Sequence, residues 1–319
     1  MQPPDPSSVR IDGPWTHRDV SANGIRLHVA EAGSGPLVLL LHGFAEFWWA
    51  WRHQLVSLAE AGFRVVAADL RGYGDSDKPP RGYDAWTLAG DVAGLVRALG
   101  ERRAHLVGHA WGGMLAWTAA ALHPRLVASV SVLGGAHPLA FRSAVGRTLL
   151  RRGQSQTRAM GHLFRFQVPM APERRLVADD AALVETLFRS WSGPQWPQGD
   201  DFAETVARFR EAVLVPGVAH SALEYYRWAF RAQFRGEGRR FTDAVGTRVA
   251  APVLQVHGEA DSCVLLETAR ESAPWLGPHS RFETLPDVGH FPHLEDPART
   301  DKAVLSFLGG AGSGAHPRA

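Results

Sequence analysis

The 319-residue chain is poor in cysteine and has no long apolar run. Cys263 is its only cysteine, which excludes an intrachain disulfide and a zinc cluster held by cysteines. No stretch approaches the roughly 18 apolar residues of a membrane-spanning helix, and the N-terminus has neither a basic start nor an apolar signal core. We therefore expect a cytoplasmic protein without a membrane span.

The common motifs for metals, phosphates and dinucleotides are also missing, since no His-Glu-x-x-His pair, phosphate loop or dinucleotide fingerprint occurs. The formal net charge is only +2, which gives no sign of a strongly basic surface. We expect His109 to pack in the interior, His257 and His293 to support their loops, and Glu46 to be a structural carboxylate. The sequence thus predicts no cofactor, no metal and no nucleic-acid partner.

Short apolar runs alternate with helical periodicity along most of the chain, and 45% of its residues are hydrophobic. Strands are predicted at residues 36–41, 63–68, 105–108, 126–133, 252–256 and 282–285, and helices at 51–61, 86–99, 112–122, 265–273 and 299–308. Such alternation is typical of an α/β fold with a mostly parallel sheet covered by helices on both faces. Residues 16–21 and 25–31, around Asn23-Gly24, predict an antiparallel hairpin at the edge of the sheet.

The alternation breaks at residues 136–245, where the sequence is helical in pattern, rich in tryptophan and arginine, and interrupted by prolines. We interpret this segment as a helical lid inserted over the carboxyl ends of the strands, where open parallel sheets bind ligands. Residues 1–135 and 246–308 then form the core domain. The glycine-rich residues 309–319 are expected to be a flexible tail.

The segment Gly108-His109-Ala110-Trp111-Gly112 combines a strand end, a sharp turn and a helix start. Its small residues fit the pattern G-x-nucleophile-x-G, in which glycines allow a strained turn and close packing of strand and helix. The central residue of that pattern normally carries the attacking atom of a hydrolase. Here the central residue is Ala110, whose methyl group cannot attack carbon.

Other residues of a hydrolase site follow in the expected order. Asp261 comes just after a buried strand and can orient an imidazole, and His290 comes after the next strand and can act as a base. Phe44 follows the first long strand, so its backbone N–H and that of Trp111 are candidate donors of an oxyanion hole. The sequence therefore predicts a hydrolase site that lacks its nucleophile.

Three segments make the chain resemble the α/β-hydrolase superfamily, and within it the epoxide-hydrolase-like branch, over residues 15–308. Residues 42–54, HGFAEFWWAWRHQ, are similar to the family's HGFPE-x-W-x-x-WRHQ segment. Residues 71–76, RGYGDS, resemble its RGYG-x-S turn, and residues 223–227, LEYYR, resemble a motif of its lid.

The resemblance implies a mechanism in which an Asp at the turn opens an epoxide to form an ester and a His activates the water that hydrolyses it. It also implies two lid tyrosines that hold the epoxide oxygen. Tyr226 matches one of them, but His162 occupies the position of the other. Ala110 stands where the family has Asp, or Ser in related hydrolases, and Ala45 replaces the usual Pro of the oxyanion segment.

The missing nucleophile leaves three explanations. Removing a nucleophile that works as a unit with its base costs about six orders of magnitude in turnover. The chain is then a variant of an active enzyme, altered at Ala110, or a hydrolase of small apolar epoxides or esters in which His290 and Asp261 activate water without a covalent intermediate. The third explanation is a non-catalytic protein that binds a small apolar ligand.

Overall fold

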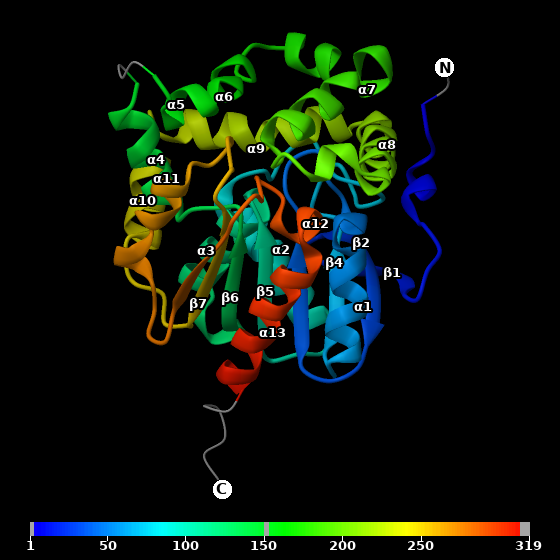
Figure 1. Cartoon of the computed structure of the whole chain (residues 1–319), viewed down its shortest axis with the longest axis vertical. Helices are drawn as coiled ribbons and strands as arrows, with labels where there is room; N and C mark the ends of the chain where they lie inside the picture. The colour runs from blue at the N-terminus through cyan, green and yellow to red at the C-terminus, as the bar shows by residue number, and fades with distance from the viewer. Residues whose placement is uncertain (1–2, 150–152, 313–319) are drawn as a thin grey trace, which may run out of the picture.

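The computed structural model describes residues 3–149 and 153–312, and these residues contain a central eight-stranded sheet (Figure 1). Its strands are β1 (Thr16–Ala22), β2 (Ile25–Gly33), β3 (Leu37–Leu41), β4 (Arg64–Ala68), β5 (Ala104–His109), β6 (Val127–Leu133), β7 (Val253–Gly258) and β8 (Arg281–Leu285). They are arranged in the order β1-β2-β4-β3-β5-β6-β7-β8. β1 and β2 form the antiparallel hairpin predicted at the edge, β2 pairs antiparallel with β4, and all other neighbours are parallel.

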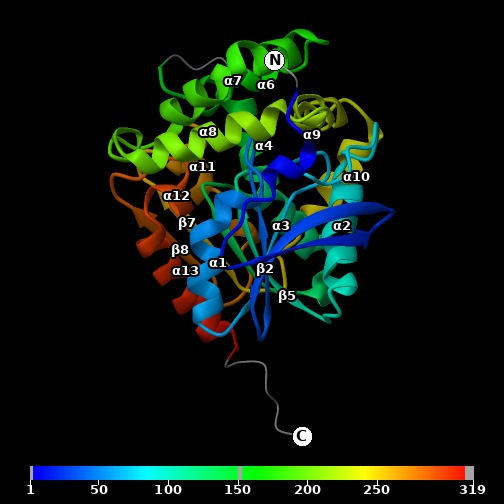
Figure 2. The same cartoon turned by 90° about the vertical axis from the view of Figure 1, so that its right-hand side faces the viewer.

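Helices cover both faces of the sheet, as predicted (Figures 1 and 2). α1 (Arg52–Glu60) and α13 (Pro297–Gly312) lie on one face, and α2 (Ala85–Ala98) and α3 (Trp111–Leu122) lie on the other. Because β3 is covered on both sides, all five of its residues are buried, which explains its uninterrupted run of apolar residues. The predicted α/β fold with a mostly parallel sheet is therefore confirmed.

Shorter elements complete this part of the chain. They are α11 (Leu266–Arg270), α12 (Pro292–Glu295) and the 3-10 turns at Pro6–Val9, Trp48–Trp51, Pro124–Leu126 and Ala273–Trp275. The helix predicted over residues 265–273 is wrong in its second half, where the chain turns before Pro274. α13 continues to Gly312, four residues into the predicted flexible tail, and the remainder of that tail lies outside the described residues.

Between β6 and β7 the described residues are helical and contain no strand. The helices are α4 (Pro138–Arg147), α5 (Gln156–Ala159), α6 (Gly161–Arg165), α7 (Ala171–Trp191), α8 (Asp200–Leu214), α9 (Val218–Ala232) and α10 (Gly236–Val245), with a 3-10 turn at Trp196–Gln198. Helices α5 to α9 lie above one end of the sheet, whereas α10 packs beside it against α3 (Figure 1). Among the described residues, no helix is long and apolar enough to cross a membrane.

Candidate active site

The sharp turn predicted around Ala110 joins β5 directly to α3. Ala110 has φ 45° and ψ −105°, a strained backbone conformation for a residue with a side chain. Its N–H donates to the carbonyl of Leu133 at 3.0 Å, which holds the turn to the neighbouring strand. A Cβ at Gly112 would lie 1.9 Å from the carbonyl oxygen of Leu41, so only glycine lets the helix begin this close to the sheet.

His290 and Asp261 form a buried pair at the ends of two neighbouring strands. The Nδ1 atom of His290 lies 2.9 Å from Oδ2 of Asp261, and the two residues are 3% and 4% exposed. The other carboxylate oxygen accepts the backbone N–H groups of Cys263 and Val264 at 2.8 and 2.9 Å. The structure therefore brings the predicted acid and base together and fixes the carboxylate on both of its oxygens.

The pair has the charge state that a general base needs. Burial lowers the pKa of His290 below its ordinary value, against the opposing effect of Asp261, so the imidazole is neutral near pH 7. Burial alone would raise the pKa of Asp261, but the imidazoles of His290 and His257 outweigh it and hold that pKa well below its usual range. With Nδ1–H donated to the carboxylate, Nε2 of His290 carries the lone pair that can accept a proton.

Glu295 holds the loop that carries His290, a role that the sequence analysis missed. Its half-buried carboxylate accepts backbone N–H groups of Gly193, Gly289 and Phe291 at 2.8, 2.8 and 3.0 Å. The N–H of His290 also donates to the carbonyl of Trp191 at 2.9 Å. The helical segment between β6 and β7 therefore fixes the position of His290. The sequence signal was a carboxylate five residues after His290, which the structure places at the end of the short helix α12.

A cavity of about 360 Å³ lies between the carboxyl ends of the strands and the helical segment. Ala110 and His290 both line it, together with Phe44, Trp111 and Tyr226. Most of the remaining lining is apolar, and α4, α9 and α10 contribute to it Leu139, Phe141, Trp228, Phe230 and Phe241. Five of the predicted site residues thus share one cavity suited to a small apolar molecule.

The predicted oxyanion segment lies directly against the turn, since a Cβ built on Gly43 would stand 3.3 Å from the methyl carbon of Ala110. Ala45 has φ 58°, whereas the ring of proline fixes φ near −65°. Proline cannot adopt this backbone, so the observed conformation of the segment requires a residue other than proline at position 45. Phe44 is buried beside it, with its ring 5.2 Å from that of Tyr226.

Tyr226 and His162 lie side by side but in different environments. The ring of Tyr226 lines the cavity and contacts the ring of Trp111, with 5.1 Å between centroids. His162 is not among the residues that line the cavity, and its ring packs against Trp191 and Tyr226 at 5.1 and 5.8 Å. Burial lowers the pKa of His162 to about 3, so the ring is neutral. His162 therefore packs behind Tyr226 and supports the cavity wall to which Tyr226 belongs.

Comparison with known proteins identifies the family to which this fold belongs. Residues 36–297 match the family model described as the alpha/beta hydrolase fold. The chain belongs to the α/β-hydrolase family, and its relatives there include epoxide hydrolases.

Two curated relatives and one solved structure illustrate this similarity. The chain is 34% identical to epoxide hydrolase 3 of Xenopus tropicalis, over 90% of this chain and 75% of the relative. It is 32% identical to epoxide hydrolase A of Mycobacterium tuberculosis, over 93% and 98%. The crystal structure of epoxide hydrolase A from Mycobacterium thermoresistibile superposes with a TM-score of 0.77 at 28% identity, covering 93% and 98% of the two chains.

Proposed function

We propose that this protein hydrolyses a small apolar epoxide or ester by direct attack of water, without a covalent intermediate. The observation that carries the proposal is the complete His290–Asp261 pair, buried at the wall of an apolar cavity that also contains Ala110. A protein that only binds a ligand has no chemical need for a neutral imidazole held by an ionised carboxylate. The relatives named epoxide hydrolases support the substrate class.

In this reaction, Nε2 of His290 accepts a proton from water while the water oxygen forms a bond to the electrophilic carbon. The methyl group of Ala110 is smaller than a carboxylate, which leaves space beside the base for that water. With an epoxide, the C–O bond breaks, Tyr226 donates to the departing oxygen, and the proton on His290 completes the diol. With an ester, the N–H groups of Phe44 and Trp111 bind the oxyanion of the tetrahedral intermediate. Its C–O bond to the alcohol then breaks, and the proton on His290 passes to the departing alcohol oxygen.

We also propose that the helical segment, residues 136–245, is the lid of this site. Its residues Trp191 and Tyr226 line the same cavity as Ala110, and the carbonyl of Trp191 accepts the N–H of His290. A closed apolar lid keeps bulk water from the site and strengthens the electrostatic interactions inside it. His162 then acts as a positioning residue for Tyr226.

The methyl group of Ala110 favours a second candidate function, in which the protein binds a small apolar ligand and catalyses nothing. In this case the cavity and Tyr226 bind the ligand, and the His290–Asp261 pair is a remnant of an ancestral enzyme. The two candidates differ in one measurable property. Only the first makes hydrolysis depend on His290.

The test is hydrolysis of aryl epoxides and aryl esters by the wild-type chain and by His290→Gln. A matched control is His105→Gln, which removes a buried imidazole of β5 that bonds to the hydroxyl of Ser129. We expect the wild type and the control to exceed His290→Gln by about 10²- to 10⁴-fold, the range for general base catalysis. Equal rates in all three proteins would overturn hydrolysis and leave the ligand-binding function.

A single-turnover reaction in H₂¹⁸O tests the absence of a covalent intermediate. We expect the wild-type chain to place solvent ¹⁸O in the product during the first turnover. Ala110→Asp restores a carboxylate nucleophile, so its first turnover on an epoxide should transfer an unlabelled carboxylate oxygen. Fast epoxide turnover by Ala110→Asp, with no His290-dependent rate in the wild type, would mean that Ala110 silences an epoxide hydrolase.

A further inference from the structure

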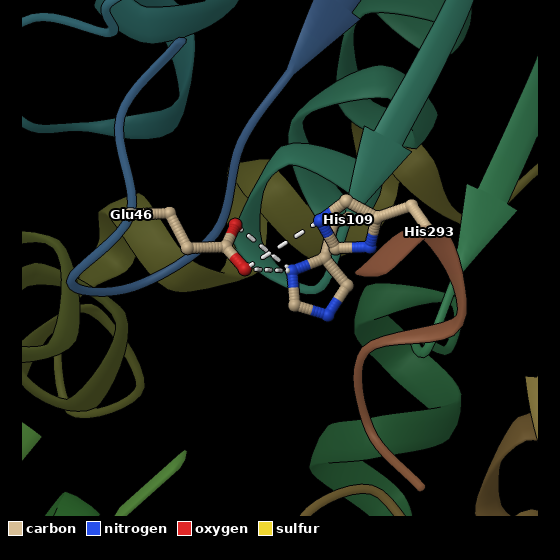
Figure 3. A group of neighbouring side chains, drawn as sticks. All are labelled: Glu46, His109 and His293. Carbon is tan, nitrogen blue, oxygen red and sulfur yellow. Dashed lines mark hydrogen bonds and ion pairs between the residues drawn. The ribbon is translucent and has the colours of Figure 1, made fainter. Parts of the chain in front are cut away.

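A second group of titratable side chains lies beneath the turn at Ala110 (Figure 3). Glu46 follows β3, His109 is the last residue of β5, and His293 belongs to α12. One ligand atom from each residue lies within 4.8 Å of the other two, and each residue is at most 1% exposed. The mechanism proposed above uses none of these side chains.

The carboxylate of Glu46 faces a nitrogen of both imidazoles. The Nδ1 atom of His109 lies 3.0 Å from each oxygen of Glu46, and Nε2 of His293 lies 3.7 Å from Oε1. The N–H of Gly43 donates to Oε2 at 2.5 Å. In Figure 3 the two imidazole rings lie side by side, and the carboxylate of Glu46 points from its loop toward one nitrogen of each ring.

The hydrogen bond on the far side of His109 determines where its proton lies. Nε2 of His109 is 2.8 Å from the carbonyl oxygen of His290, and a carbonyl can only accept, so Nε2 carries hydrogen. In the neutral ring, Nδ1 then presents a lone pair to the carboxylate of Glu46. Two electron-rich groups at this distance need a cation between them, which can be a proton or a metal ion.

His293 distinguishes these two cations. Neither of its ring nitrogens has a hydrogen-bond partner among the described residues, although the side chain is completely buried. Buried polar atoms in native proteins nearly always have a partner. A proton on His109 satisfies Glu46 but leaves His293 without one, whereas a metal ion can bind all three side chains.

We propose that Glu46, Nδ1 of His109 and Nε2 of His293 form a binding site for Zn²⁺ or a similar divalent transition-metal ion. Two imidazoles and a carboxylate are a common zinc ligand set, with bonds of about 2.0–2.2 Å that place ligand atoms roughly 3–4 Å apart. The two separations from the carboxylate, 3.0 and 3.7 Å, fit this range, and the two nitrogens lie within 4.8 Å of each other. The carbonyl of His290 and the N–H of Gly43 orient two of the ligands, as outer partners do in metal sites.

A metal site at this position differs from what the sequence predicted, namely no metal, with His109 in packing and His293 in loop support. It does not depend on the proposed hydrolysis, because binding of a metal ion is measured directly. A metal here joins the loops that follow β3, β5 and β8, which carry Phe44, Ala110 and His290. The site would therefore hold together the three segments that line the reactive end of the cavity.

The test is binding of Zn²⁺ to the full-length chain after chelator treatment, measured by competition with a chromophoric chelator. We expect one equivalent of tightly bound Zn²⁺ in the wild type and in His105→Gln, the matched control on the same strand. His293→Gln and Glu46→Gln should each weaken this binding by about 100-fold or more, since loss of an outer partner alone costs 10- to 100-fold. Unchanged affinity in both variants would overturn the proposal.

A second measurement uses the wild type alone and does not require the variants to fold. X-ray absorption of the Zn²⁺-loaded protein should show two imidazole ligands and an oxygen donor at about 2.0–2.2 Å. Failure to retain one equivalent, together with ¹⁵N resonances of a doubly protonated His109 that Zn²⁺ does not alter, would assign the cation to a proton and overturn the metal site.

Discussion

The Nδ1 atom of His290 lies 2.9 Å from Oδ2 of Asp261, although residue 110 beside this pair carries only a methyl group. The pair does not need a nucleophile to hold its geometry. Asp261 is fixed by backbone N–H groups of its own loop, and the backbone of His290 is fixed by Trp191. Orientation of the base is therefore independent of the identity of residue 110.

Asp261→Asn tests the role of the carboxylate. Asparagine keeps an oxygen for the N–H groups of its loop, but its amide can donate to Nδ1 of His290 and so favours the tautomer whose Nε2 carries hydrogen. We expect the His290-dependent rate to fall by about 10⁴-fold, as for an analogous substitution in a catalytic triad. Hydrolysis kinetics measure this, with Glu259→Gln as a control near the same loop. A wild-type rate in Asp261→Asn would contradict the assignment.

Ala110→Gly tests the strain of the turn. A residue with a side chain in this backbone region costs about 1–3 kcal/mol, whereas glycine adopts it freely but loses about 0.5–1 kcal/mol in conformational entropy. We expect Ala110→Gly to raise the free energy of unfolding by about 1 kcal/mol, measured by denaturant titration. Ala120→Gly, inside α3, should lower it by a similar amount. Destabilisation by both substitutions would argue against strain at Ala110.

Glu295→Gln tests whether the carboxylate of Glu295 holds the loop that carries His290. Glutamine has the same shape, but its amide nitrogen cannot accept from the N–H groups that now bond to Glu295. At least one buried N–H then loses its acceptor, and the free energy of unfolding should fall by about 1–3 kcal/mol. Thermal or denaturant unfolding measures the loss. Glu267→Gln, at an exposed position of α11, is the control and should leave stability unchanged.

Asp201→Asn tests a pH-dependent link between the helical segment and the core. Its carboxylate, at the start of α8, accepts from Arg52 of α1 at 2.5 Å and from the indole of Trp196 at 2.8 Å. Burial alone would raise the pKa of Asp201, but hydrogen bonds with His53, Trp196 and Arg52 outweigh it and hold that pKa well below the usual 3.8.

Because the folded-state pKa of Asp201 is depressed, its stabilising effect is present above pH 3.8 and is lost as pH falls below that value. The melting temperature of Asp201→Asn should be lower than that of the wild type at pH 7, and the difference should shrink between about pH 4 and 2. Asp200→Asn, which removes a carboxylate at the exposed neighbouring residue, is the matched control. If the difference in melting temperature between Asp201→Asn and the wild type did not change with pH, the pH-dependent link between α8 and α1 would be contradicted.

The sheet could be predicted because strands that are buried on both faces of a parallel sheet consist almost entirely of apolar residues, and such runs are visible in the sequence. The run at residues 36–41 corresponds to β3, and the run at 252–256 to β7, with ends shifted by one or two residues. The pair of Asp261 and His290 was predictable for the same reason. Residues that follow parallel strands meet at one edge of a sheet, so their proximity follows from the order of the strands.

The contacts that depend on side-chain packing were not predictable. Glu46, His109 and His293 come from three distant segments, and no spacing in the sequence shows that their rings and carboxylate meet. The position of His162 behind Tyr226 depends likewise on how α6 packs against α9. Local patterns determine elements, whereas such clusters depend on how several elements are positioned together.

Because Gly112 sets the close approach of α3 to β3, we expect the turn to keep its geometry when residue 110 alone is substituted. The backbone geometry requires glycine at position 112, but it does not require a particular side chain at position 110. Serine, cysteine or aspartate at position 110 would each present a different attacking atom from the same turn, toward the same imidazole. The same fold could therefore present a hydroxyl, a thiol or a carboxylate as nucleophile. Comparison of the rates of the three variants would show how well the residues around position 110 support each of them.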